Sequence, residues 1–226
     1  MKQKIEKIKQ FIFKKTKCLL LFICLIIFLA IAEDVFEQEI MKADILGYQF
    51  ISTYLISDFA TPIAKIITKL GGANVLITLS IIFLIVIKNK KISFSIVANL
   101  GIITILNILL KNIVQRPRPT EYRMISETGY SFPSGHSMVS MAFYGFLIYL
   151  IYKNIKNTKL KWSLIIILSF LIVAIGTSRI YLGVHYTSDV LAGFMISISY
   201  LVIYTSVIKK FLLEREKKNE KQENNK

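Results

Sequence analysis

The stretch WSLIIILSFLIVAIG, residues 162–176, decides the fold, because it carries neither a charged side chain nor a polar face. It lies in one of six uncharged runs of 15 to 19 residues, which are 18–32, 70–87, 92–110, 137–152, 162–178 and 190–208. A helix needs about 20 apolar residues to cross a bilayer, and long side chains at its ends can complete a shorter run. The sequence therefore predicts an all-α polytopic membrane protein, a bundle of six transmembrane helices.

The composition excludes other classes of protein. The chain has 226 residues, of which 54% are hydrophobic and 19% are charged. Disordered chains are poor in apolar residues, and two cysteines cannot staple a disulfide scaffold. The net charge of +15 is unusual, and taken alone it would suit nucleic acid or an anionic membrane surface. Its position along the chain therefore matters.

Most of the basic residues fall on one side of such a bundle. Four regions, 1–17, 88–91, 153–161 and 209–226, hold 21 of the 29 Lys and Arg residues. The positive-inside rule places these regions in the cytoplasm, together with both termini of a cell-membrane protein. The charge is then topological, and no nucleic-acid partner is needed to explain it.

The same charges divide the chain into segments. Residues 1–17 form a basic cytoplasmic N-terminus, 18–208 the transmembrane domain, and 209–226 a charged cytoplasmic tail that is expected to be disordered from Glu214. Residues 33–69 lie outside, where acids interleaved with apolar residues indicate one or two helices on the membrane surface before the second span begins. Ala30-Ile31-Ala32 also resembles a signal-peptide cleavage site, and cleavage there would leave the later topology intact.

The outer side carries eight basic residues that the topology does not explain. Three are single lysines, and the other five follow the third or the fifth predicted helix: Lys42, Lys65 and Lys69, then Lys111, Arg116, Arg118, Arg123 and Arg179. The two histidines of the chain and Asp189 fall on that side as well. The sequence therefore predicts a site at the extracytoplasmic rim of the bundle.

The first segment of this site has the spacing K-x6-R-P, from Lys111 to Arg118 and Pro119. The two prolines at 117 and 119 stop any helix and fix an extended approach. An ammonium group and a planar guanidinium that converge here would suit an oxyanion. Basic residues at a helix end are also common as interfacial anchors, so this segment is weak evidence by itself.

The second segment is SFPSGHS, residues 131–137, immediately before the fourth predicted helix. Free N–H groups and the helix dipole make such a helix start a phosphate site, and Gly135 lets the backbone approach the ligand closely. His136 would lie beside a bound anion, where an imidazole can act as a general acid. Ser134 is explained equally well as a phosphate contact or as the N-cap of the helix.

The third segment is SRIYLGVHYTSD, residues 178–189. Arg179 follows the fifth predicted helix, and His185 and Asp189 are four residues apart, so on a helix they share a face. A carboxylate there would accept the imidazole Nδ1–H and leave Nε2 free as a nucleophile. The competing interpretation is a core histidine that an aspartate satisfies.

A zinc site built from His136, His185 and Asp189 is a further alternative, since two histidines and a carboxylate can hold the metal. The neighbouring cations would repel a divalent metal ion and attract an anion. The pattern therefore predicts phosphate as the ligand and no metal.

Together the three segments resemble the signature motifs of the type 2 phosphatidic acid phosphatase and vanadium haloperoxidase superfamily, in order and within residues 111–189. The resemblance implies that His185 attacks phosphorus to form a phosphohistidine while Asp189 orients it. It implies that His136 protonates the leaving oxygen and later activates water, which predicts a bell-shaped pH profile. The implied phosphate-binding residues are Lys111, Arg118, Ser134, Gly135 and Arg179.

The resemblance implies a metal-independent membrane phosphatase without a cofactor, of bacterial type. Its substrate would be a lipid phosphate such as undecaprenyl diphosphate, phosphatidate or phosphatidylglycerophosphate, and its other partners the membrane lipids. Arg116 and Arg123 match no motif position and are interpreted as headgroup contacts. Two alternatives stay open: a lipid phosphotransferase that passes the phosphoryl group to an acceptor other than water, and a non-enzymatic anion-binding or transport protein.

Overall fold

The computed structural model describes residues 2–37 and 41–223, and the side chains of residues 15–37 and 41–209. Every regular element in these residues is a helix. The helices are α1 (Lys2–Phe36), α2 (Lys42–Tyr54), α3 (Ala60–Leu70), α4 (Ala73–Val86), α5 (Lys90–Val114), α6 (Gly135–Asn154), α7 (Thr158–Tyr181) and α8 (Thr187–Glu223). The prediction of an all-α protein is confirmed.

Five of the described helices, α1, α5, α6, α7 and α8, are long and apolar enough to cross a membrane. A sixth span exists if α3 and α4 count as one, since the pair meets the same criterion with a bend of 48° between its helices. The structure thus has the composition of a membrane bundle of five or six spans. It differs from the predicted second span at its start, because α3 ends at Leu70 and α4 begins at Ala73.

The bend lies at Gly71 and Gly72, where close packing excludes larger side chains. A Cβ atom on Gly71 would lie 2.5 Å from Cγ2 of Ile175 in α7, so only glycine permits this approach. Gly72 is the N-cap of α4 and has an extended backbone. The uncharged run that begins at Leu70 conceals the break, because glycine carries no charge.

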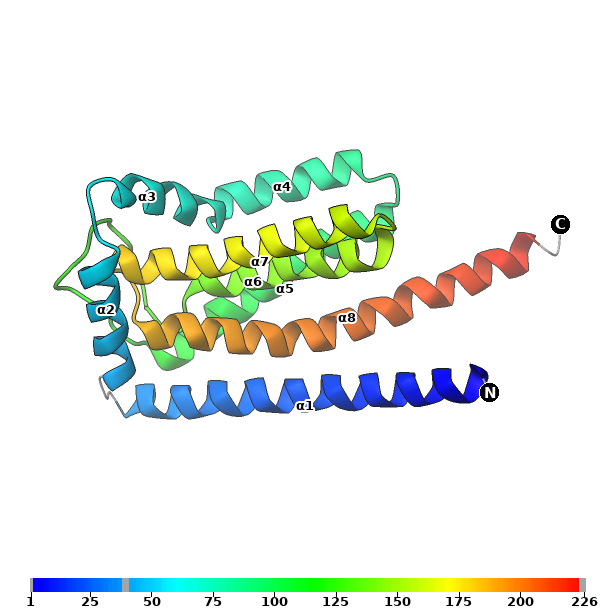
Figure 1. Ribbon diagram of the computed structural model, residues 1–226, viewed down its shortest axis with the longest axis horizontal. Coiled ribbons are helices and arrows are strands. Elements are labelled where there is room, and N and C mark those ends of the chain that lie inside the picture. The colour runs from blue at the N-terminus through cyan, green and yellow to red at the C-terminus, as the bar shows by residue number, and fades with distance from the viewer. Residues whose placement is uncertain (1, 38–40, 224–226) are drawn as a thin grey trace.

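The long helices lie side by side, and α2 lies across one end of them (Figure 1). Helix α1 packs against α8, and α6 packs against both α7 and α8. Both described ends of the chain lie at the end opposite α2 (Figure 1). The predicted surface region 33–69 contains α2 and α3. Helix α2 lies across the bundle end, as a surface helix would, whereas α3 packs along α7. Residues 38–40 of this region lie outside the described residues.

The largest buried cluster packs the long helices together within the bundle. Leu76, Phe143, Ile175 and Tyr204 belong to it and join α4, α6, α7 and α8.

The C-terminal tail is helical as far as the structure describes it. Helix α8 continues to Glu223, so the expectation of a disordered tail is wrong for residues 214–223. The segment after Lys209 has no proline or glycine and is rich in strong helix formers, which favours continuation. Residues 224–226 of the tail lie outside the described residues.

Candidate functional site

The structure brings the predicted site residues together at the end of the bundle that α2 crosses. Lys111 lies in the last turn of α5, the loop 115–134 carries Arg118, and α6 begins with Gly135. Arg179 lies in the last turn of α7, and His185 lies in the turn between α7 and α8. Segments far apart in sequence thus converge, as the three motifs predicted.

His185 is held between a carboxylate and a guanidinium. Its Nδ1 lies 3.2 Å from Oδ2 of Asp189, and its Nε2 lies 3.0 Å from an Nη1 nitrogen of Arg118. Arginine can only donate, so Nε2 accepts this bond and carries a lone pair. The proton of the neutral ring is therefore on Nδ1, donated to Asp189, which is the tautomer that the sequence predicted.

Burial keeps this imidazole neutral. The side chain of His185 is 3% exposed, and burial lowers the pKa of His185 to about 4. The hydrogen bond and charge of Asp189 oppose this shift, while the charges of Arg118 and Arg179 add to it. At neutral pH the ring is therefore uncharged and able to act as a nucleophile.

Backbone carbonyls fix the guanidinium of Arg118. Its Nε donates to the carbonyl of Gly129 at 3.0 Å, and Nη2 donates to the carbonyl of Thr128 at 3.1 Å. Nη1 donates to the carbonyl of Val184 at 3.0 Å as well as to His185. The planar guanidinium is thus directed at Nε2 of His185 from the loop 115–134, which we call the motif loop.

Arg179 is almost fully buried, with 1% of its surface exposed. Nη1 donates to the hydroxyl of Thr68 at 2.7 Å, and Nη2 donates to Oε1 of Glu127 at 2.5 Å. Burial alone would raise the pKa of the Glu127 carboxyl, but Arg179, helped by His136 and Arg118, holds that pKa below its usual value. Glu127 is therefore an anion on the guanidinium that is predicted to bind phosphate, and no motif pointed to it.

The start of α6 combines a cap with a close approach. Ser134 is the N-cap, and its Oγ accepts hydrogen bonds from the backbone and the hydroxyl of Ser137, at 3.5 and 3.0 Å. The N-cap interpretation of Ser134 is thus observed. A Cβ atom on Gly135 would lie 3.0 Å from Oδ1 of Asn107, which explains the glycine. The ammonium group of Lys111 donates to the carbonyl of Tyr130.

His136 faces the break between α3 and α4. A Cβ atom on Gly72 would lie 3.7 Å from Nε2 of His136. His136 and Arg179 both line a cavity of about 670 Å³, whereas His185 lines a different cavity of about 450 Å³. The two imidazoles therefore line different cavities.

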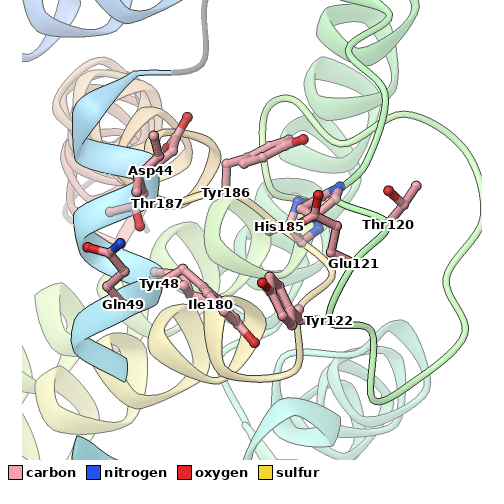
Figure 2. A pocket seen from close by; sticks show the side chains of 13 residues that line it. Asp44, Tyr48, Gln49, Thr120, Glu121, Tyr122, Ile180, His185, Tyr186 and Thr187 are labelled. Carbon is pink, nitrogen blue, oxygen red and sulfur yellow. The ribbon is translucent and has the colours of Figure 1, made fainter. Parts of the chain in front are cut away.

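Figure 2 shows the cavity beside His185, with α2 along one wall and the motif loop along the other. Tyr48 of α2 and Tyr122 of the loop stack across it, with ring centroids 4.7 Å apart. Burial and the neighbouring Tyr122 raise the pKa of Tyr48, so its phenol remains neutral. This stack ties the crossing helix to the loop that carries Arg118.

Sequence reasoning missed a buried ion network around Arg116. Its Nη1 donates to Oδ1 of Asp189 and to the hydroxyl of Ser188, each at 2.7 Å, and Nη2 donates to Oδ2 of Asp44 at 2.8 Å. Asp44 in turn accepts bonds from the backbone and the hydroxyl of Ser188, at 2.8 and 2.9 Å. The guanidinium lies 4.0 Å from the ring centre of Tyr186.

The interpretation of Arg116 as a headgroup contact is therefore wrong, because the residue is 8% exposed and its charge is used inside the protein. Arg123, in contrast, is exposed and donates to the carbonyl of Pro119, so its contact with a headgroup stays a prediction. Among the described residues, no three His, Cys, Asp or Glu side chains form a group that could hold a metal ion. The cations around His185 suit an anionic ligand.

Comparisons with known proteins agree with this geometry. A family model described as the PAP2 superfamily matches residues 92–212, which include all three motifs. Phosphatidylglycerophosphatase B of Bacillus subtilis is 39% identical over 42% of this chain and 47% of its own length. Undecaprenyl-diphosphatase of Sulfolobus acidocaldarius is 30% identical over 61% of this chain and 66% of its own length. The chain thus spans between about half and two thirds of these curated relatives.

A solved structure extends the likeness to the fold. The crystal structure of a transmembrane PAP2 type phosphatidylglycerolphosphate phosphatase from Bacillus subtilis superimposes with a TM-score of 0.73 and 27% identity. The match covers 84% of this chain and 96% of that one. The likeness therefore includes most of the bundle as well as the motifs.

Proposed function

The chain belongs to the PAP2 superfamily, and from this premise we propose that it is an integral-membrane lipid phosphatase with His185 as its nucleophile. Its substrate is a lipid phosphomonoester or diphosphate of the undecaprenyl diphosphate, phosphatidate or phosphatidylglycerophosphate type. The relatives named above, a phosphatidylglycerophosphatase and an undecaprenyl-diphosphatase, support this range. The chemistry needs no metal and no cofactor.

One observation carries the proposal: a buried, neutral His185 with Asp189 on Nδ1 and Arg118 on Nε2. A core histidine that is merely satisfied would not need a guanidinium on its second nitrogen. This arrangement instead prepares a lone pair beside an anion-binding group. The surrounding Arg179 and Lys111 extend the same positive surface.

The reaction has two steps. In the first, Nε2 of His185 bonds to phosphorus, the bond to the leaving oxygen breaks, and His136 gives that oxygen a proton. In the second, His136 takes a proton from water, the water oxygen bonds to phosphorus, and the bond to His185 breaks. Phosphate then leaves, and both histidines return to their starting states.

The cations stabilise the charge that spreads over the phosphoryl oxygens in the transition state. Phosphate oxygens replace two protein partners seen in the structure: Nε2 of His185 on Arg118 and the carboxylate of Glu127 on Arg179. Lys111 and the N–H groups at the start of α6 complete the site, where Gly135 keeps the backbone accessible.

The site works from the extracytoplasmic side, at the outer leaflet. The distribution of basic residues supports this orientation, because the end opposite α2 holds both described ends of the chain and the basic loops 88–91 and 153–161. A headgroup at the membrane surface then reaches His185 while the lipid tail stays in hydrocarbon.

The test is phosphate release by the purified protein in detergent, from a panel of lipid phosphates. We expect His185→Ala to abolish release and Asp58→Asn, an exposed acid outside the site, to leave it unchanged. Equal retention volume and melting temperature would show that the variants are folded. Undiminished release by His185→Ala would overturn the phosphohistidine mechanism. Loss of substrate without release of phosphate, in the presence of an acceptor, would favour the phosphotransferase alternative.

A further inference from the structure

The cavity on the His136 side has features that the two reaction steps do not use. It measures about 670 Å³, within the range of small-molecule sites. Lys65 and Lys69 of α3 line it, as do residues 72–75 at the break between α3 and α4. His136 and Arg179 line it too, so it adjoins the phosphate site.

Lys65 and Lys69 are four residues apart in α3, so their ammonium groups share one helix face. Among the described residues, neither lysine forms an ion pair with a carboxylate. The acid that lines the same cavity, Glu127, is paired with Arg179. The cavity wall is therefore rich in positive charge that no protein group neutralises.

The break in the helix adds backbone donors to this wall. Helix α4 has 14 residues, and no side chain caps its start at Gly72. The first helical hydrogen bond runs from the N–H of Leu76 to the carbonyl of Gly72, at 3.2 Å. The N–H groups of residues 73–75 precede this bond and belong to residues that line the cavity, where the helix dipole favours an anion.

A separate observation points to an oxygen ligand here. Nε of Arg179 is buried and has no hydrogen-bond partner among the described residues, and the side chain is 1% exposed. Buried donors are normally paired, so this unpaired N–H indicates that the region around Arg179 can accept an oxygen ligand. Arg179 lines this cavity, where it meets the phosphate site.

The reaction geometry places the leaving group in this cavity. In phosphoryl transfer the attacking and leaving atoms are roughly in line with phosphorus. His185 attacks from one side, so the leaving oxygen lies on the other, next to the acid His136. His136 lines this cavity and His185 lines the other one.

Resting on the lipid phosphatase function above, we propose that this cavity is a leaving-group subsite in which Lys65, Lys69 and the N-terminus of α4 hold a second phosphate of the substrate. The preferred substrates are then lipids whose leaving group is itself anionic. The leaving group of a lipid diphosphate is a lipid monophosphate. The leaving group of a phosphatidylglycerophosphate is a phosphatidylglycerol, which carries a phosphodiester. The leaving group of phosphatidate is an uncharged diacylglycerol, which the two lysines would not stabilise.

With a diphosphate substrate, the same bonds form and break as in the first reaction step described above. Nε2 of His185 bonds to the terminal phosphorus, the bridging phosphorus–oxygen bond breaks, and the bridging oxygen takes the proton of His136. Negative charge grows on the leaving phosphate during this step. Lys65 and Lys69 offset that charge, so their effect appears in kcat/KM for the anionic leaving group.

The experiment compares two substrates with the same tail, farnesyl diphosphate and farnesyl monophosphate, on the purified full chain in detergent. For the double variant Lys65→Ala/Lys69→Ala we expect kcat/KM on the diphosphate to fall about 10- to 100-fold, as for lost charge-assisted hydrogen bonds. On the monophosphate we expect a fall of less than about threefold, because an ordinary surface ion pair contributes little. Lys42→Ala, an external lysine outside the cavity, is the matched control.

Two further measurements separate binding from folding. The double variant Lys65→Arg/Lys69→Arg keeps both charges and should retain most of the diphosphate preference. Inorganic diphosphate, used as an inhibitor of monophosphate hydrolysis, should bind the original protein more tightly than inorganic phosphate does, and the alanine variant should lose this difference.

The outcomes are distinct. An equal fall on both substrates, or no fall on either, overturns the subsite while phosphate release itself upholds the phosphatase. A loss of preference in the arginine variant overturns it as well, since charge would then not be the cause. No phosphate release by the original protein from any lipid phosphate overturns the proposed function instead.

Discussion

Oδ2 of Asp44 lies 2.8 Å from the guanidinium of Arg116, which joins the crossing helix α2 to the motif loop. The same guanidinium lies 2.7 Å from Oδ1 of Asp189. Arg116 of the loop therefore holds the carboxylate of Asp189, and Asp44 of α2 holds Arg116 in turn. We therefore expect Asp44 and Arg116 to position His185 through Asp189.

Replacement of Arg116 by alanine should destabilise the protein. The change leaves two buried carboxylates without their counter-ion, a loss typically worth about 3–5 kcal/mol. We expect a lower melting temperature in detergent and a strong loss of kcat. Lys42→Ala, which removes an exposed cation outside both cavities, is the control and should change neither.

Replacement of Asp44 by asparagine tests the same link from the side of α2. Asparagine keeps the shape but removes the charge that Arg116 and Ser188 contact, so we expect kcat to fall about tenfold. The control is Asp58→Asn, in which an exposed carboxylate is changed. Unaltered kcat in Asp44→Asn, at equal expression, would show that α2 does not position the catalytic groups.

Replacement of Glu127 by glutamine should tighten the binding of inorganic phosphate. The carboxylate now occupies Nη2 of Arg179 at 2.5 Å, and its pKa is below the usual value, so it competes as an anion throughout the neutral range. Removal of the charge should lower the inhibition constant of phosphate about fivefold to tenfold. Asp58→Asn, which changes an exposed acid outside both cavities, is the control, and weaker phosphate binding by Glu127→Gln would contradict this role.

The titration of His185 can be followed directly, because the chain has only two histidines. Imidazole resonances of isotope-labelled protein in detergent should give His185 a pKa of about 4, and His136→Gln identifies the signal. The folded pKa is below the ordinary value of about 6.5, so His185 stabilises the folded state fully above pH 6.5. This contribution is lost as the pH falls from 6.5 through 4. A midpoint at 6.5 or above would contradict the buried, neutral nucleophile.

The orientation in the membrane is testable with a single cysteine. Ser126 is exposed in the loop that carries Glu127. In a background of Cys18→Ser and Cys24→Ala, we expect Ser126→Cys to react with a membrane-impermeant thiol reagent in intact cells. A cysteine at Lys156, in the loop at the other end, should react only after permeabilisation. The reverse pattern would place the site in the cytoplasm.

Local sequence signals were enough for the membrane bundle and for the contact between His185 and Asp189. The uncharged runs reveal long apolar helices whatever their packing. His185 and Asp189 are only four residues apart, so Asp189 in the first turn of α8 can contact His185 in the turn that precedes the helix. Arg118 and Arg179 were expected in the site because the positive-inside rule does not account for basic residues on the outer side.

The missed features depend on contacts between distant segments. Asp44 and Arg116 are 72 residues apart, and no spacing rule links a surface helix to a loop. Glu127 is one acid in an irregular loop, and only the fold brings it to Arg179. The Gly71-Gly72 pair was the available signal for the break, but the apolar run around it indicated a single helix.

The contact between Arg118 and Nε2 of His185 also bears on which molecules the protein ignores. While the guanidinium covers the lone pair, the imidazole is masked against electrophiles in general. We expect that only a ligand with enough negative charge to attract Arg118 exposes this nitrogen. Anion binding and exposure of the proposed nucleophile would then occur together, and an uncharged ester in the same pocket would not react with His185.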